Sequence, residues 1–209
     1  MKPQGFFRPQ CSLNRLSEHP LYKDTRLGGR LTPFKGVWPT VDPGAFIFHG
    51  AQVVGDVEIA ADASIWHNSV LRGDVNYIRV GARSNIQDGS VVHVSTHTYP
   101  TIIGADVLVA HMAMLHGCVL EDGAFVGMGA IVMDNARIEP DGMLAAGAML
   151  TPGKTIKQGE LWTGRPAKFV RRVTEDEIRK NRSMGEHYRK IAEQHLIDSV
   201  GETAEKPYP

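Results

Sequence analysis

Aliphatic residues recur at every sixth position through the central part of the chain. The series comprises Ile47, Val53, Ile59, Ile65, Leu71, Val80, Ile86, Val92, Ile103, Val109, Leu115, Leu120, Val126, Val132, Ile138, Leu144, Leu150, Ile156 and Trp162. A small residue or valine stands four positions after most of them. A period of six matches neither a helix, at 3.6, nor an alternating strand, at 2. It is typical of the hexapeptide repeat, so the sequence predicts an all-β solenoid followed by one α-helix.

Three hexapeptides make one triangular coil, so every third aliphatic residue lies on the same side of the prism. Coils stack about 4.8 Å apart, at the spacing of neighbouring β-strands. On this basis Leu71, Val92 and Leu115 share one side in successive coils. The residue after each points outward, which predicts that His93 and His116, 23 residues apart, lie side by side.

The six-residue phase is interrupted in one stretch. Three extra residues lie between Leu71 and Val80, five lie between Val92 and Ile103, and one residue is missing between Leu115 and Leu120. Insertions in a solenoid become loops on one face, and loops carry function more often than the scaffold does. The stretch from residue 71 to 118 is therefore the candidate functional region.

The rest of the chain divides into simple segments. Residues 1–40 contain five prolines and predict an irregular N-terminal arm. The β-helix is expected over 41–165, a C-terminal segment with a packing helix over 166–200, and a mobile tail over 201–209. Thr174 and Glu177 have the spacing of a capping box, which predicts where that helix begins.

Composition changes this picture little. The chain has 23 basic and 23 acidic residues, so no net charge favours a nucleic acid or a membrane surface as partner. It has no secretory h-region and no apolar run near ~18 residues, which predicts a cytoplasmic protein. Cys11 and Cys118 lie far apart without a CxxC motif, so the sequence suggests neither a disulfide framework nor a thiolate zinc site.

Three histidines in the interrupted stretch could meet at one metal ion. His93 and His116 share the outward column, whereas His111 belongs to the preceding side of the prism, around a corner. Three neutral imidazoles with one open position form the arrangement in which zinc lowers the pKa of bound water to about 7. Imidazole also suits iron and cobalt, so the ligands are better specified than the ion.

Polar residues precede these histidines at an unusual density. Arg72 and Asp74 leave one strand together, as a structural ion pair, an inter-subunit clamp or a catalytic pair. Asn85, Gln87 and Asp88 surround Ile86. An amide such as Gln87 could hydrogen-bond a metal-bound water and orient it.

The segments RGDVNYIRVGARSNIQDGSVVH and HMAMLHGC resemble the gamma-class carbonic anhydrase family, and the resemblance continues over the repeat region into WTGRPAKFVRR. It implies a left-handed parallel β-helix and a homotrimer. It also implies zinc between subunits, bound by His93 and His116 of one chain and His111 of the next. Structural or catalytic parts are implied for Arg72, Asp74, Asn85, Gln87 and Asp88.

The sequence departs from that family in its proton-transfer groups. Active members have an acidic loop after the first ligand histidine and a further glutamate after the Arg-x-Asp motif. Here the loop reads VSTHTYPT and the second position is Val75. Regeneration of the hydroxide requires proton export, so weak or absent hydration activity is one expectation. His97 is a candidate replacement shuttle because its ordinary pKa is near neutral.

The leading hypothesis is a metal-dependent lyase in which metal-bound hydroxide attacks carbon dioxide to give bicarbonate. One alternative is a hexapeptide acyltransferase that uses a coenzyme A thioester, with a single histidine as base. Against it, one base explains only one of the three histidines. Another alternative is a non-catalytic trimeric assembly subunit that retains the metal site.

Overall fold

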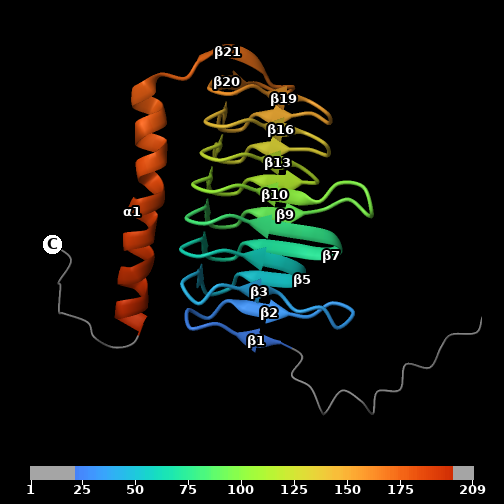
Figure 1. The fold of residues 1–209 in the computed structure, drawn as a ribbon, viewed down its shortest axis with the longest axis vertical. Coiled ribbons are helices and arrows are strands. Elements are labelled where there is room, and N and C mark those ends of the chain that lie inside the picture. The colour runs from blue at the N-terminus through green and yellow to red at the C-terminus, as the bar shows by residue number, and fades with distance from the viewer. Residues whose placement is uncertain (1–21, 200–209) are drawn as a thin grey trace, which may run out of the picture.

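The computed structural model describes residues 22–199, so the expected tail at 201–209 and the first part of the N-terminal arm lie outside the described residues. Parallel strands stack as the coils of a three-sided solenoid, and helix α1 (Glu175–Ser199) lies alongside it (Figure 1). The predicted parallel β-helix with a C-terminal helix is confirmed. No helix within the described range is long and apolar enough to cross a membrane.

The first two sides of the prism form one continuous sheet because two strands run around the corner between them. The first side contains β2 (Arg30–Thr32), β5 (Gln52–Ile59), β7 (Val70–Val80), β9 (Val91–His93), β12 (Met114–His116), β15 (Ile131–Val132) and β18 (Met149–Leu150). The second side contains β3 (Thr40–Val41), the ends of β5 and β7, β10 (Thr101–Ile103), β13 (Val119–Leu120), β16 (Arg137–Ile138) and β19 (Thr155–Ile156). β1 (Lys23–Asp24) pairs antiparallel with β2.

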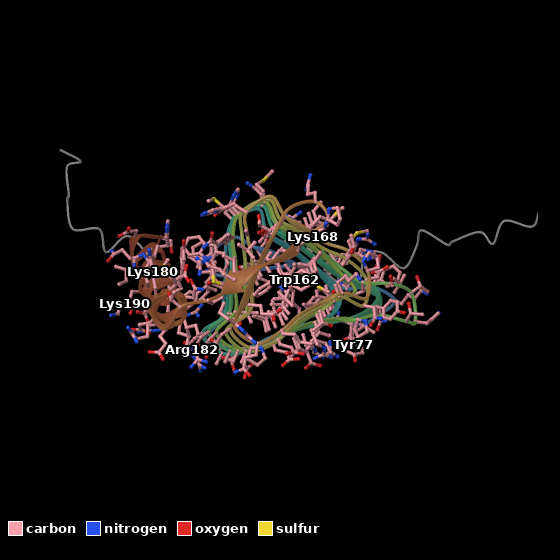
Figure 2. All side chains as sticks on the ribbon, turned by 90° about the horizontal axis from the view of Figure 1, so that it is seen from above. Tyr77, Trp162, Lys168, Lys180, Arg182 and Lys190 are labelled. Atoms are coloured by element: carbon pink, nitrogen blue, oxygen red, sulfur yellow. The ribbon has the colours of Figure 1, made fainter. Side chains whose placement is uncertain are left out.

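The third side is a separate sheet that faces α1. It contains β4 (Phe46–Ile47), β6 (Ser64–Ile65), β8 (Asn85–Ile86), β11 (Leu108–Val109), β14 (Phe125–Val126), β17 (Met143–Leu144), β20 (Glu160–Thr163) and β21 (Lys168–Arg172). β21 turns back antiparallel to β20 and closes this end of the stack. Viewed along the stack, the helix with Lys180, Arg182 and Lys190 lies at one edge of the molecule, and Tyr77 lies toward the opposite one (Figure 2).

The aliphatic columns fill the interior of the prism as predicted. Leu71 pairs with Val92 and Leu115 pairs with Val132, so that each side chain stacks on the one below. Every member of the six-residue series from Ile47 to Ile156 is buried, and Trp162 is partly buried at the last coil. Burial of this kind stabilises a fold by about 25 cal/mol for each Å² of apolar surface removed from water.

Two of the valines that stand four positions after an aliphatic residue of the series are not buried. Val75 is 36% exposed because β7 continues past the corner as a long strand. Val119 lies on the outer face of β13, and the buried Cys118 lies beside it inside the prism. The missing residue between Leu115 and Leu120 accounts for this shift.

The solenoid also begins earlier than the boundary at residue 41 that the sequence suggested. β2 and β3 pair in parallel with β5, so residues 30–41 form part of the first coil rather than an irregular arm. The prolines do not prevent this pairing, since Pro33 follows β2 and Pro39 precedes β3. At those places a backbone N–H is not required by the sheet.

Helix α1 begins with the predicted capping box. The N–H of Glu177 donates to Thr174 Oγ1 at 3.3 Å, and the N–H of Thr174 donates to Glu177 Oε2 at 2.9 Å. Hydrogen bonds to the Glu177 carboxylate, from the guanidinium of Arg171 and then from the N–H of Thr174, lower the pKa of Glu177 to about 2. The start of the helix is therefore fixed by local side-chain chemistry, as the sequence indicated.

Candidate metal centre

His93 and His116 lie side by side, as the stacking of the coils predicted. The two residues are paired in register between β9 and β12, and their rings are 5.1 Å apart between centroids. Nδ1 of His93 lies 3.1 Å from Nε2 of His116. Both side chains are partly exposed on the outer face of the first side, at 18% and 35%.

Each of these two rings has its other nitrogen beside a carboxylate. Nε2 of His93 lies 3.0 Å from Asp74 Oδ1, and Nδ1 of His116 lies 2.6 Å from Asp134 Oδ1. An ionised carboxylate only accepts, so in the neutral imidazole the proton resides on the nitrogen that faces it. The lone pairs of the two remaining nitrogens then face one another.

This donor set fits a divalent cation. Two facing lone pairs repel one another unless a proton or a cation lies between them, and a carboxylate on the second ring nitrogen is the usual companion of a metal-binding histidine. Ligand nitrogens of a tetrahedral zinc site lie about 3.3 Å apart, given Zn–N bonds of about 2.0 to 2.1 Å. The observed 3.1 Å between the two nitrogens is close to that spacing.

His111 has the same kind of partner but lies elsewhere. Its Nδ1 is 2.9 Å from Asp88 Oδ2, and both side chains are exposed by about two fifths, at 45% and 40%. It follows the third-side strand β11, as the sequence placed it. Within residues 22–199 of one chain, no group of three or more His, Cys, Asp or Glu side chains could hold a metal ion. A single chain therefore does not bring His111 to the other two histidines.

Arg72 and Asp74 form an ion pair beside His93. Burial raises the pKa of Asp74, but hydrogen bonds from His93 and Arg72 and the positive charge of Arg72 outweigh burial and lower it. Asp74 is thus held ionised as an acceptor for the His93 ring. Asp134, which contacts His116, was not among the site residues predicted from the sequence.

Asn85 and Gln87 lie on the third side with Asp88, away from the His93 and His116 pair. Asn85 is 1% exposed, and its Nδ2 donates to Ser64 Oγ at 2.7 Å. It lies on β8 between β6 and β11, and α1 packs against both of those strands. Gln87 is also buried, at 3%. The predicted polar residues therefore form two groups in one chain, one on each side of a corner.

The remaining candidates are a loop histidine and a cysteine. His97 lies in the loop between β9 and β10, is exposed, and has a positive φ of 58°. Cys118 is fully buried next to β12, and burial raises the pKa of its thiol to about 12. Cys118 therefore packs in the interior of the prism, next to the proposed site.

The chain is similar to known proteins over most of its length, although no family model matches it. Gamma carbonic anhydrase 1, mitochondrial, of Arabidopsis thaliana is 45% identical over 78% of this chain, and the match spans only 61% of the plant protein. A carbonic anhydrase of Geobacillus kaustophilus is 40% identical over 75% of this chain and 85% of its own length. The crystal structure of a hexapeptide transferase family protein from Anaplasma phagocytophilum has a TM-score of 0.76 and 51% identity, and covers 78% of this chain and 96% of that one.

Proposed function

The chain belongs to the gamma carbonic anhydrase family, and from this premise we propose that it is a metal-dependent lyase that interconverts carbon dioxide and bicarbonate. The observation that carries the proposal is the pair formed by His93 and His116, in which Nδ1 of His93 lies 3.1 Å from Nε2 of His116 and the other nitrogen of each ring lies beside a carboxylate. A pair of ordinary surface histidines would not require a carboxylate on the far nitrogen of each ring. A carboxylate behind each imidazole supports the proposal, because metal-binding histidines usually donate their second ring N–H to such a group.

We propose that the metal is held between subunits of a homotrimer. His93 and His116 would come from one chain and His111 from the next, because one chain leaves His111 around the corner. The proposed ion is zinc, with iron or cobalt as alternatives for the same imidazole donors. Cyclic symmetry would then generate three equal sites. The expected cytoplasmic location stays a prediction.

When bound, the ion would act as a Lewis acid that lowers the pKa of a water molecule to about 7. The residues of the chain supply orientation. Asp74, ionised beside Arg72, accepts the Nε2 proton of His93, and Asp88 accepts the Nδ1 proton of His111. Each contact leaves the other ring nitrogen as a ligand. Gln87, at the same corner as Asp88, is proposed to orient a reacting water molecule through its amide, and Asn85 to support Gln87 from β8.

An acyltransferase that uses a coenzyme A thioester is the second candidate. The name of the similar Anaplasma phagocytophilum structure favours it. A single general base would explain one histidine, whereas three histidines here each lie against a carboxylate. A non-catalytic trimer that keeps the metal site is the third candidate.

Metal content and carbon dioxide hydration, measured together on anaerobically purified protein, test the proposal. We expect one metal ion per chain and hydration above the buffer rate. Protein without metal that transfers acyl groups from coenzyme A would favour the second candidate. Fully metallated protein without hydration activity would favour the third.

His97 is proposed to carry the proton away from the site. Replacing His97 with alanine should lower turnover at low buffer concentration, because proton transfer to buffer then becomes limiting, and added imidazole should restore the rate. Stopped-flow hydration at several buffer concentrations measures this effect. Unchanged turnover at all of them would make His97 a bystander.

A further inference from the structure

We infer that Asp134 is a positioning residue that fixes His116 for metal binding and connects this ligand to the loop between β9 and β10. The inference rests on the proposed function, since it concerns the same metal site. Asp134 follows β15, on the coil after the one that carries His116. Its carboxylate touches one side chain on each of two earlier coils.

The first contact sets the orientation of the His116 ring. Oδ1 of Asp134 lies 2.6 Å from Nδ1 of His116, the shortest of the three carboxylate contacts to the proposed ligands. Because the carboxylate accepts the Nδ1 proton, Nε2 carries the lone pair, and that atom is the one that faces His93. Without this acceptor the ring could rotate or place its proton on Nε2, which would remove a ligand.

Asp134 differs from Asp74 in its other partner. Asp74 is paired with the guanidinium of Arg72, which draws charge away from His93. The second oxygen of Asp134 accepts a neutral hydrogen bond from Ser95 Oγ at 2.9 Å, and no cationic side chain among residues 22–199 forms an ion pair with it. The charge of Asp134 is therefore not shared with a guanidinium, as that of Asp74 is.

Gly117 makes the close approach of Asp134 possible. A methyl group added at Gly117 would lie 2.5 Å from Oδ1 of Asp134 and 2.9 Å from Cβ of Tyr99. The backbone φ of Gly117 is also positive, at 55°. Any other residue there would be strained and would push the carboxylate away from its histidine. Glycine is therefore required after the proposed ligand His116, because a larger residue would displace the carboxylate of Asp134.

The second contact joins the site to the loop. Ser95 donates its hydroxyl to Asp134, and its backbone oxygen accepts a hydrogen bond from Asn76 Nδ2 at 3.0 Å. Its N–H donates to the carbonyl of Tyr99 at 2.9 Å, which closes the base of the loop that carries His97. Asp134 therefore links His116 to the segment that bears the proposed proton shuttle.

Binding of Co²⁺ to the metal-free protein tests this role, because its visible spectrum reports ligand geometry. Asp134→Ala should bind Co²⁺ about 10 to 100 times more weakly than wild type and shift its absorption bands. Asp134→Asn should recover part of the Co²⁺ affinity and part of the wild-type spectrum, since the amide oxygen can still accept the Nδ1 proton. Hydrogen exchange in residues 94–100 should become faster in Asp134→Ala and in Ser95→Ala. The matched control is Asp106→Asn, which alters an aspartate paired with Arg83 on another corner and should leave Co²⁺ binding unchanged.

The outcomes separate this inference from the proposed function. Wild-type protein that binds no Co²⁺ would overturn both. Wild type and Asp134→Ala that bind Co²⁺ with equal affinity and identical spectra would overturn only the role of Asp134. Unchanged exchange of the loop in both Asp134→Ala and Ser95→Ala would remove the connection to the loop. Circular dichroism establishes that each variant retains its β-structure.

Discussion

Replacing His93 or His116 with alanine should abolish stoichiometric metal binding while the solenoid remains folded. Each variant leaves the proposed site with two imidazoles of three, and one of the two facing nitrogens is gone. The fold should survive because both side chains point outward, whereas the interior is made by the aliphatic columns. Elemental analysis of the purified protein measures the metal, and circular dichroism with thermal unfolding measures the fold.

His187→Ala is the matched control, since it removes an exposed histidine of α1 and should leave the metal content at the wild-type value. Full metal occupancy in either His93→Ala or His116→Ala would show that the ligand assignment is wrong. Loss of metal together with loss of β-structure would not separate binding from folding, so affinity would then be measured on His93→Gln. A folded glutamine variant that binds metal as wild type does would again contradict the assignment.

Mixing His111→Ala chains with His93→Ala chains should restore metal sites that neither variant forms alone. In one chain His111 lies beside Asp88 on the third side, around a corner from His93. A site shared between subunits can take His111 from the His93→Ala chain and His93 with His116 from the His111→Ala chain. Subunits are exchanged by partial unfolding and refolding, and the metal content of the mixture is compared with that of each variant.

Two results would contradict the shared site. The first is that mixed oligomers, identified by mass tags on the two chains, bind no metal, whereas wild type treated in the same way does. Alternatively, either variant alone could retain full metal content. A mixture of His93→Ala with His116→Ala is the control, because those ligands come from one subunit and the exchange cannot reunite them.

The repeat allowed the register of the solenoid to be predicted residue by residue. A hexapeptide period leaves one way to stack coils, so the pairing of His93 with His116 followed from counting alone. The separation of His111 from that pair followed from the same count. Side-chain identity at the corners was less predictable, since the long strand β7 exposes Val75.

The missed residues are those whose roles depend on side-chain direction. Asp134 lies in a turn, where aspartate is common for local backbone reasons, so its type gave no signal. Gly117, directly after a predicted ligand, was the only hint of a close approach. The burial of Asn85 and Gln87 near α1 could not be inferred from spacing. The first strands of the solenoid were not predicted, because prolines disfavour strands in general, whereas here they lie just outside the strand ends.

Helix α1 runs back along the stack (Figure 1), and its side chains contact coils that are far apart. Near its start, Arg182 binds Asp141 through two hydrogen bonds of 2.9 and 2.7 Å, and near its end Ala192 packs with Phe48 and Trp66. In a solenoid each coil otherwise touches only its neighbours, so the terminal coils are free to fray independently. Because α1 packs against both the first and the later coils, fraying of the first coils would also disturb the helix that packs on the later ones. The coils that carry the histidines lie between these two contacts of the helix, where the stack has the least freedom to open.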